Sequence, residues 1–345
     1  MIKSIIFKNF SNKNIAKMKL VLVFQVYLLY ISLPMQLFSD VGDLDYTFSR
    51  EKYLTIENSF RVKMSGLEFV IPTQIGPRIL HFSRIGEENI FKVMEDQIQN
   101  SKSKSWLNFG GHRLWRAPED KILTYSPENS NVEIQTQKEF ISISKVDSVN
   151  QILKEIEISP IKDYSIQVKH KITNLSDKKQ TLSVWALTVL PLSGKALIPL
   201  SPRGTHPQDL LPTDSVQLWA YTNLSDSIFN FKKNYILIEK KENSHLPQKI
   251  GLNGEPGWAA YINGANVFIK KFSYKKYRNY PDKNSSIEVF VNQKFLELET
   301  LSPIRTLKPK ESITHIETWI LEKVPNSIST DDQLFDFIQT KIQEK

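Results

Sequence analysis

The sequence predicts an all-β protein, a large antiparallel sandwich with a short C-terminal helix. Apolar and polar residues alternate with a period of two in segment after segment, and polar turn clusters separate these segments roughly every 10 to 14 residues. Glycine is scarce, with 12 in 345 residues, which disfavours glycine-rich nucleotide-binding folds. The 40% hydrophobic and 24% charged content is that of an ordinary globular protein.

The N-terminal segment, residues 1–39, is predicted to be an export signal. Residues 1–19 contain five lysines and no acid, residues 20–38 contain no charge, and Asp40, Asp43 and Asp45 follow. A basic stretch before an apolar run and acids after it are typical of a signal peptide. An uncleaved membrane anchor over residues 20–38 is the alternative, since nineteen uncharged residues can span a bilayer. We therefore expect export to the periplasm or cell envelope, with membrane contact only through this segment if it is retained.

The charge and the cysteine content exclude several classes of function. The whole chain has a formal net charge of +8, and the five lysines of residues 1–39 leave +3 for the remainder. A nearly neutral chain lacks the basic surface of a nucleic-acid binder, so we expect no nucleic-acid partner. The absence of cysteine excludes disulfides, thiolate metal sites and cysteine nucleophiles.

The strand-like segments follow one another in what we predict to be one domain, residues 40–330. Polar turns separate them, and no flexible linker divides the range. The clearest are 132–136 (VEIQT), 140–146 (FISISKV), 152–159 (ILKEIEIS), 164–172 (YSIQVKHKI) and 182–190 (LSVWALTVL).

Two stretches are predicted to be helical. Residues 331–345 begin with two aspartates, which suit a helix N-terminus, and place Leu334, Phe335, Ile338 and Ile342 on one face. We expect a shorter helical turn near residues 89–97.

The usual cofactor and metal motifs are absent. The chain contains no G-x-G-x-x-G, Walker, G-x-S-x-G or H-E-x-x-H motif. His315 and Glu317 would share one strand face, but two side chains do not make a metal site, and a solvated surface is the favoured interpretation. We therefore expect no cofactor and no metal.

Three segments nevertheless combine arginine, histidine, tryptophan and carboxylate residues: 75–82 (IGPRILHF), 108–120 (NFGGHRLWRAPED) and 295–303 (FLELETLSP). In the third, strand alternation places Glu297 and Glu299 on the face opposite to the leucines. Carboxylates beside arginine and tryptophan suit a sugar, because they accept hydroxyl hydrogen bonds while an aromatic ring covers the apolar sugar face. The alternatives are an ordinary polar outer face, salt-bridged arginines and tryptophans in the core.

Taken in order, several motifs resemble an uncharacterised family with the galactose mutarotase-like (aldose 1-epimerase-like) fold. The resemblance covers about residues 55–322 and implies a β-supersandwich whose concave face binds carbohydrate. The motifs are GPRI (76–79), GGHRLWRAPE (110–119), WALT (185–188), YPD (280–282), ELETLSP (297–303) and LKPKESITHIETWIL (307–321).

The resemblance implies roles for individual residues. The run 298–300 (LET) is similar to the leucine–glutamate–threonine run of aldose 1-epimerases, whose glutamate is the catalytic base, so Glu299 is the predicted base. Arg78 and Arg113 are similar to arginines that hold sugar hydroxyls, and they hint at an acidic or phosphorylated saccharide. The other predicted substrate-binding residues are Trp115, Trp185, Tyr280 and Asp282.

One departure from the mutarotase pattern keeps two functions open. Trp185 stands roughly where mutarotases have their acid, a histidine, and mutarotation needs both a base and an acid. His112 would supply the acid if its loop folds over the cleft, and Tyr280 is a weaker candidate. The missing histidine favours an exported carbohydrate-binding protein. The alternative is a sugar-active enzyme that works by epimerase-like or lyase-like proton transfer, with Glu299 as base.

Overall fold

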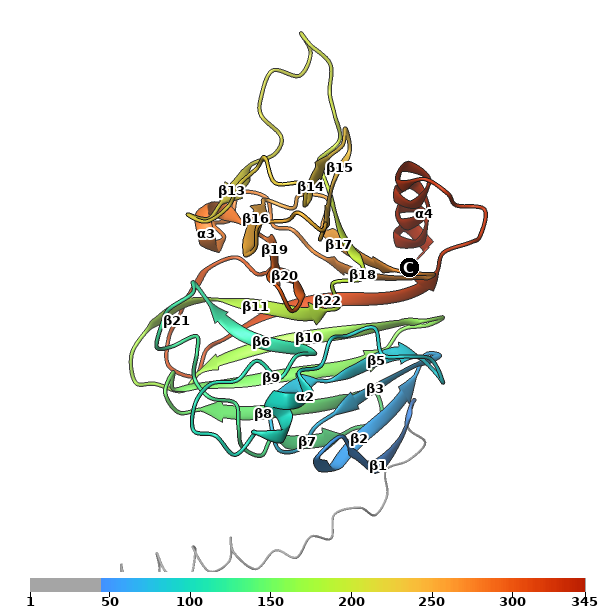
Figure 1. Cartoon of the computed structure of the whole chain (residues 1–345). Helices are drawn as coiled ribbons and strands as arrows, with labels where there is room; N and C mark the ends of the chain where they lie inside the picture. The colour runs from blue at the N-terminus through green and yellow to red at the C-terminus, as the bar shows by residue number, and fades with distance from the viewer. Residues whose placement is uncertain (1–44, 345) are drawn as a thin grey trace, which may run out of the picture. The chain divides into compact units, whose positions relative to one another are not determined.

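The computed structural model describes residues 45–344, which form one compact unit. The predicted signal peptide or anchor lies outside the described residues. Three antiparallel β-sheets build this unit, with three short helices (Figure 1), as the sequence predicts for an all-β sandwich. Among residues 45–344, no helix is long and apolar enough to cross a membrane.

Two of the sheets are large and the third is a smaller N-terminal sheet. The small sheet has the order β1 (Thr47–Tyr53), β2 (Ile56–Met64), β3 (Leu67–Ile71), β5 (His81–Arg84). The ten-stranded sheet has the order β14 (Phe229–Phe231), β15 (Tyr235–Glu239), β12 (Lys195–Pro199), β17 (Trp258–Asn263), β18 (Asn266–Phe272), β22 (Ser312–Lys323), β10 (Ser165–Asn174), β9 (Ile152–Pro160), β8 (Ile141–Asp147), β7 (Glu133–Thr136). The eight-stranded sheet has the order β13 (Val216–Leu218), β16 (Gln248–Leu252), β19 (Ile287–Val291), β20 (Leu296–Leu301), β11 (Gln180–Leu190), β6 (His112–Ala117), β4 (Arg78–Ile79), and β21 (Arg305–Leu307) pairs with β11.

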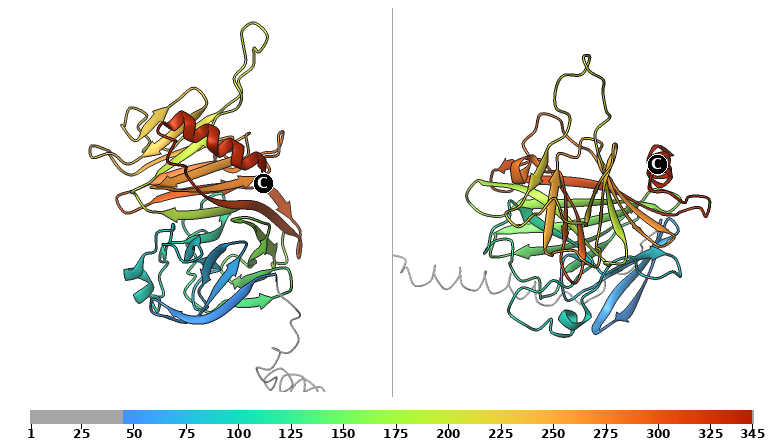
Figure 2. Two further views of the ribbon diagram at one scale, coloured as in Figure 1. Left: turned by 90° about the vertical axis from the view of Figure 1, so that its right-hand side faces the viewer. Right: turned by 45° about the horizontal axis from the view of Figure 1, so that its top comes forward.

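The sequence-predicted strands agree with β7 to β11 to within two residues at either end, because alternation is a local signal. The predicted C-terminal helix is confirmed as α4 (Asp331–Glu344), and it packs on the ten-stranded sheet through Leu334, Phe335 and Ile338 (Figure 2). The shorter helix is α2 (Glu95–Gln99), which lies later than predicted. A third helical segment, α3 (Pro281–Asn284), contains left-handed residues at its centre.

The main apolar core is built by side chains from all three sheets. Trp319 of β22 is its largest fully buried side chain, and the rings of Phe82, Phe91 and Phe268 pack around it with centroids 5.2 to 5.7 Å away. Burying a side chain of this size contributes about 1.5 to 3 kcal/mol relative to exposure. Strands β4, β6, β11, β16, β19 and β20 of the eight-stranded sheet place side chains in this core, which leaves their other face for a site.

A polar layer is buried inside the same core, which corrects the surface position predicted for His315 and Glu317. Glu317 is 0% exposed and His315 is 6% exposed. The ammonium of Lys270 on β18 lies 2.9 Å from Glu317 Oε1 and donates to the carbonyl oxygens of Ala186 (3.0 Å) and Leu298 (3.3 Å) in the eight-stranded sheet. Lys270 therefore links the two large sheets.

Candidate functional site

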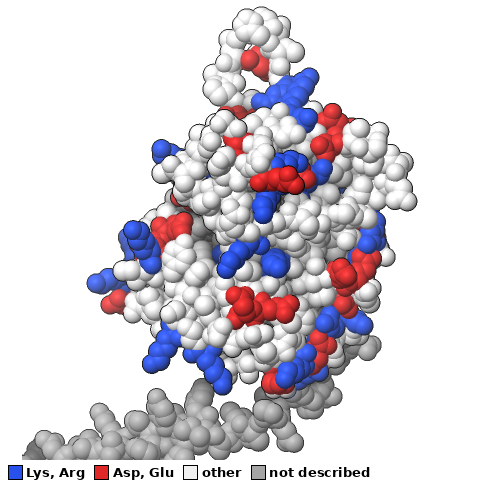
Figure 3. Space-filling model, in the orientation of Figure 1, with Lys and Arg blue, Asp and Glu red and all other residues white. Residues whose placement is uncertain are grey.

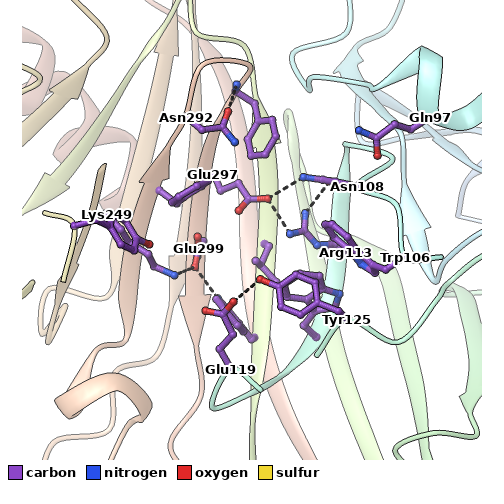
Figure 4. A pocket seen from close by; sticks show the side chains of 16 residues that line it. Gln97, Trp106, Asn108, Arg113, Glu119, Tyr125, Lys249, Asn292, Glu297 and Glu299 are labelled. Carbon is purple, nitrogen blue, oxygen red and sulfur yellow. Dashed lines mark hydrogen bonds and ion pairs between the residues drawn. The ribbon is translucent and has the colours of Figure 1, made fainter. Parts of the chain in front are cut away.

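A cavity of about 370 Å³ lies on the face of the eight-stranded sheet that points away from the core, and we call it the sheet pocket (Figure 4). Its wall combines residues of five neighbouring strands with residues of α2 and the connecting loops. The residues that line it are Gln97, Trp106, Asn108, Arg113, Trp115, Glu119, Tyr125, Trp185, Leu187, Tyr221, Lys249, Phe290, Asn292, Phe295, Glu297 and Glu299.

Strand register places the key side chains side by side. Glu299 of β20 is opposite Leu187 of β11, and Leu187 is opposite Arg113 of β6. Directly opposite residues of antiparallel strands project from the same face of a sheet. Trp115 and Trp185 are likewise paired, so these residues from three strands converge in one pocket.

Alternation along β20 gives the pocket two carboxylates. Leu296 and Leu298 belong to the main core, whereas Glu297 and Glu299 line the pocket. This is the arrangement that the period-two pattern of residues 295–301 predicts. Figure 4 shows both carboxylates projecting from β20 into the space that Arg113 faces from the opposite wall.

Glu299 is held on one of its two oxygens. Trp185 Nε1 donates to Glu299 Oε2 at 2.8 Å, and Lys249 Nζ lies 3.1 Å from the same oxygen. Glu299 Oε1 is buried and has no hydrogen-bond partner in the protein. The indole that replaces the expected histidine therefore orients the carboxylate and leaves its Oε1 atom buried without a partner.

Lys249 joins Glu299 to a third carboxylate, Glu288. Lys249 Nζ lies 2.7 Å from Glu288 Oε2, and its ammonium stands 4.8 and 4.7 Å from the ring centroids of Trp185 and Trp219. Burial acts to lower the pKa of Lys249, but the carboxylates of Glu288 and Glu299 outweigh it and raise that pKa above its ordinary value. Burial raises the pKa of Glu288 well above its usual range, despite the ammonium.

Arg113 and Glu297 form the second buried ion pair of the pocket. Arg113 NH2 donates to Glu297 Oε1 at 2.8 Å, Arg113 NH1 donates to Asn108 Oδ1 at 3.3 Å, and the guanidinium lies 4.2 Å from the centre of the Trp115 ring. Burial raises the pKa of Glu297, and Arg113 opposes that rise. The guanidinium is thus fixed between an acid, an amide and an indole.

Aromatic rings form one side of the pocket. The rings of Trp106, Trp115 and Tyr125 lie with centroids 5.1 to 5.6 Å apart, and Trp185 lies 5.6 Å from Trp115. The indole nitrogens of Trp106 and Trp115 are buried without a hydrogen-bond partner in the protein. Together with Glu299 Oε1, the pocket residues therefore offer unpaired donors and an unpaired acceptor beside apolar ring surfaces.

The structure brings together four of the eight residues predicted for the site: Glu299, Arg113, Trp115 and Trp185. Arg78, His112, Tyr280 and Asp282 do not line the sheet pocket. Arg78 is fully buried and donates to Glu128 Oε2 at 2.7 Å and to the carbonyl oxygen of Gly110 at 2.5 Å. Arg78 stabilises the junction of β4 with the loop before β6. It is therefore a salt-bridged structural arginine, which is the alternative to a sugar-binding one.

His112 lies on the opposite side of the sheet from the pocket. Neighbouring strand residues project from opposite faces, and since Arg113 faces the pocket, His112 faces the core. Its Nδ1 is 2.9 Å from Thr188 Oγ1, and its Nε2 is 2.7 Å from His170 Nε2. The expectation that a loop carries His112 over the cleft is wrong, because the residue begins β6.

Tyr280 and Asp282 lie outside the sheet pocket. The Tyr280 ring is stacked on Tyr274 with centroids 5.2 Å apart, and its hydroxyl accepts a hydrogen bond from the Lys275 backbone at 2.7 Å. Asp282 lines a separate hollow of about 170 Å³ with Trp219. Asp282 is one of the left-handed residues of α3, and Tyr280 immediately precedes that segment.

One buried cluster approaches the spacing of a metal site. Ligand atoms of His112, His170 and Glu317 lie within 4.8 Å of one another. The Glu317 carboxylate is already paired with Lys270 and accepts a hydrogen bond from Trp319 at 2.7 Å, and the two imidazoles bond to each other. A cation would compete with the Lys270 ammonium in a closed core, so these residues do not fit a metal ion.

Sequence reasoning missed several pocket residues, among them Lys249, Trp106, Asn108 and Tyr125. Asn108 belongs to a segment that the motif analysis singled out, and Trp106 lies two residues before it. No sequence pattern indicated that Lys249 belongs to the pocket, because its strand looks like an ordinary strand segment. Its position in the pocket depends on strand pairing over long sequence separations.

Solved structures share this fold. A galactose mutarotase-like protein from Lactobacillus casei ATCC 334 aligns with a TM-score of 0.50 over 76% of this chain and 100% of its own, at 8% identity. The Slr1438 protein from Synechocystis sp. PCC 6803 aligns with a TM-score of 0.49 over 81% of this chain and 99% of its own, at 12% identity. A galactose mutarotase related enzyme from Lactobacillus acidophilus aligns with a TM-score of 0.48 over 79% of this chain and 100% of its own, at 9% identity. No protein-family model and no curated protein matches the chain. The galactose mutarotase-like fold is confirmed, and at these identities the likeness establishes the fold alone.

Proposed function

We propose that this chain, which has the galactose mutarotase-like fold, is a carbohydrate-binding protein and that the sheet pocket holds the sugar. The observation that carries the proposal is the set of unpaired polar atoms beside aromatic rings. Sugar hydroxyls both donate and accept hydrogen bonds, so they match the indole N–H groups of Trp106 and Trp115 and the free oxygen of Glu299. The apolar face of a sugar ring would cover the indoles.

The test is direct binding of sugars to the purified protein, measured by calorimetry and by tryptophan fluorescence. Trp115→Ala should weaken sugar binding, because it removes both a ring surface and an unpaired donor. Trp258→Ala is the matched control, since Trp258 packs between the ten-stranded sheet and α4 and does not line the pocket. Equal affinities of wild type and Trp115→Ala would mean that the indole serves the core alone.

A sugar-active enzyme is the second candidate, and the free oxygen of Glu299 favours it. In epimerase-like chemistry a base takes the proton of the anomeric hydroxyl while an acid protonates the ring oxygen. Glu299 Oε1 would be the base. No histidine of the described residues lines the sheet pocket, and its possible proton donors are Lys249, Tyr125 and Tyr221. Burial raises the pKa of Tyr221 to about 12, so its proton is present at neutral pH but is poorly acidic.

Polarimetry separates the two candidates. Freshly dissolved α-glucose or α-galactose would lose optical rotation faster with the protein than in buffer if the protein interconverts anomers. Binding without such acceleration would exclude simple mutarotation and leave the carbohydrate-binding function. Acceleration that Glu299→Gln abolishes would establish the enzyme.

The proposal includes export to the periplasm or cell envelope through residues 1–39. Support comes from the five lysines and the uncharged run that follows them. Intact mass of the protein from the envelope fraction would decide between cleavage near residue 39 and a retained anchor. Recovery of the full-length chain from the cytosol alone would contradict export.

A further inference from the structure

A second hollow, of about 450 Å³, lies beside α2 and the turn between β19 and β20. We call it the α2 hollow. The residues that line it are Lys92, Val93, Met94, Glu95, Asp96 and Lys294. It shares no lining residue with the sheet pocket.

The α2 hollow adjoins one end of the sheet pocket. Gln97 and Asn292 line the sheet pocket, and their near neighbours in the chain, Asp96 and Lys294, line the α2 hollow. In Figure 4, Gln97 and Asn292 lie across from each other at the end of the pocket remote from Glu119. The two spaces are therefore neighbours at this end of the sheet pocket.

Part of the boundary between the two spaces is apolar. Phe295 lines the sheet pocket, Met94 lines the α2 hollow, and both belong to one small cluster with Val189. The side chains of Met94 and Phe295, one from each space, thus pack together, and the part of the boundary that they form is apolar. A chain of sugar rings has alternating apolar faces and hydroxyl edges, which fit such a boundary.

The charged side chains of the α2 hollow are available to a ligand. Lys92, Glu95, Asp96 and Lys294 form no hydrogen bond or ion pair with other side chains of the described residues. Glu95, Asp96 and Lys294 are exposed, and Lys92 is half-buried. The hollow therefore presents free donors and free acceptors over the apolar groups of Val93 and Met94, which is the chemistry that recognises hydroxyl groups.

The balance of charge indicates the kind of saccharide. The α2 hollow has two cations and two anions, and the sheet pocket has three carboxylates (Glu119, Glu297 and Glu299) against two cations (Arg113 and Lys249). An acidic or phosphorylated saccharide would meet excess negative charge and no unpaired arginine. Acidic and basic side chains are also interspersed over the face seen in Figure 3, with no large basic patch. A neutral saccharide avoids this repulsion.

We propose that the α2 hollow is a second sugar subsite and that the natural ligand is a neutral oligosaccharide of at least two rings. This inference rests on the proposed carbohydrate-binding function. One ring occupies the sheet pocket against the indoles, and the chain continues past Gln97 and Asn292 into the α2 hollow, where Asp96 and Lys294 bind its hydroxyls.

The test is a length series measured by calorimetry on the purified protein. The probes are glucose with cello- and malto-oligosaccharides of two to six rings, galactose with its β-1,4-linked oligomers, and oligogalacturonates as the acidic counterpart. We expect affinity in a neutral series to rise at least tenfold between one ring and three rings and then to level off. Oligogalacturonates should bind more weakly than the neutral oligomers of the same length.

Substitutions in the α2 hollow test whether the gain in affinity with oligosaccharide length arises there. Asp96→Ala and Lys294→Ala should bring the affinity for the three-ring ligand down to that of a single ring, whereas Lys102→Ala, an exposed lysine that lines neither space, should leave it unchanged. A single ring that binds as tightly as its oligomers would overturn the second subsite but leave the sugar function standing. A length-dependent gain that survives both variants would also overturn it. Absence of binding by every probe would contradict the proposed function itself.

Discussion

At the scale of single residues, Glu299 shows how burial prepares a side chain for a ligand. Its Oε2 atom is bound by the Trp185 indole and the Lys249 ammonium, whereas its Oε1 atom is buried and unpaired. Leaving a buried acceptor unpaired costs about 1 to 3 kcal/mol, which a ligand hydroxyl would recover. The carboxylate is therefore oriented before the ligand arrives, and its free oxygen gains most from binding.

Glu299→Gln should lower sugar affinity about tenfold, since it replaces a charged acceptor by a neutral one, and should abolish any mutarotation. Titration calorimetry and polarimetry measure the two effects. Glu119→Gln is the matched control, because Glu119 is an exposed residue of the same pocket and is engaged by the Tyr125 hydroxyl. The role of Glu299 would be refuted if both variants behaved alike.

At the scale of elements, the connection into β6 depends on close packing against β4. Gly111 has a φ of +68°, and a Cβ atom placed there would lie 2.1 Å from the carbonyl oxygen of Ile79. Only glycine combines this backbone conformation with such an approach. The paired glycines 110 and 111 thus set the start of β6, and through it the position of Arg113 and Trp115.

Gly111→Ala should destabilise the fold by more than 3 kcal/mol, because it adds a clash with backbone to the strain of a positive φ. Gly86→Ala is the matched control, with a φ of +80° and no heavy atom within 4 Å of the added Cβ, and it should cost about 1 kcal/mol. Urea unfolding of both variants measures the difference. Equal losses would show that backbone strain alone, and not contact with β4, explains the glycine.

Lys270 connects the two large sheets. Its ammonium pairs with Glu317 and donates to carbonyl oxygens of β11 and β20, the strands that bear Trp185 and Glu299 on their other faces. Lys270→Met should cost about 3 to 5 kcal/mol, because it leaves the buried Glu317 charge without its cation. The double variant with Glu317→Gln should recover part of that loss, since it removes the orphaned charge.

Denaturant unfolding tests the role of Lys270. Lys271→Met is the control, as the neighbouring lysine is half-buried on the other face of the strand. A double variant no more stable than Lys270→Met would show that the orphaned charge is not the source of the loss.

At the scale of the whole molecule, buried histidines make stability depend on pH. Burial lowers the pKa of His170 to about 4 and that of His315 to about 3, and the nearby Lys270 ammonium adds to the effect. Burial and the neighbouring His170 lower the pKa of His112 well below its ordinary value. Below pH 6.5 these imidazoles become protonated in the unfolded chain but stay neutral in the folded chain. The contribution of these histidines to stability is therefore complete above pH 6.5 and is lost as the pH decreases toward 4.

The expected loss is up to about 1.4 kcal/mol per histidine for each pH unit below 6.5. Urea unfolding between pH 8 and pH 4 measures it. His170→Gln should flatten this dependence, whereas His206→Gln, at an exposed loop position, should not. A His170→Gln variant with the same pH dependence as the wild type would contradict neutral burial of this ring.

The parts of the site that could be predicted are those encoded by local alternation. The pattern of residues 295–301 predicts that Glu297 and Glu299 share a face, and the pocket contains both. His112 was misplaced for the same physical reason: once residues 112–117 form a strand, Arg113 and His112 must face opposite ways. Lys249 lies some fifty residues from Glu299 in sequence, and the pairing of β16, β19 and β20 brings it there.

The sequence by itself determined the all-β class and the approximate bounds of β7 to β11 and α4, because side-chain alternation is a property of neighbouring residues. It also determined the galactose mutarotase-like fold, through the order of motifs along the chain. Only the tertiary structure decided which face of each strand is buried. It also decided that Trp185, Lys249, Arg113 and Glu299 meet in one pocket while Arg78 and His112 serve the interior. Strand register and sheet order depend on how the core packs as a whole, and no short segment contains that information.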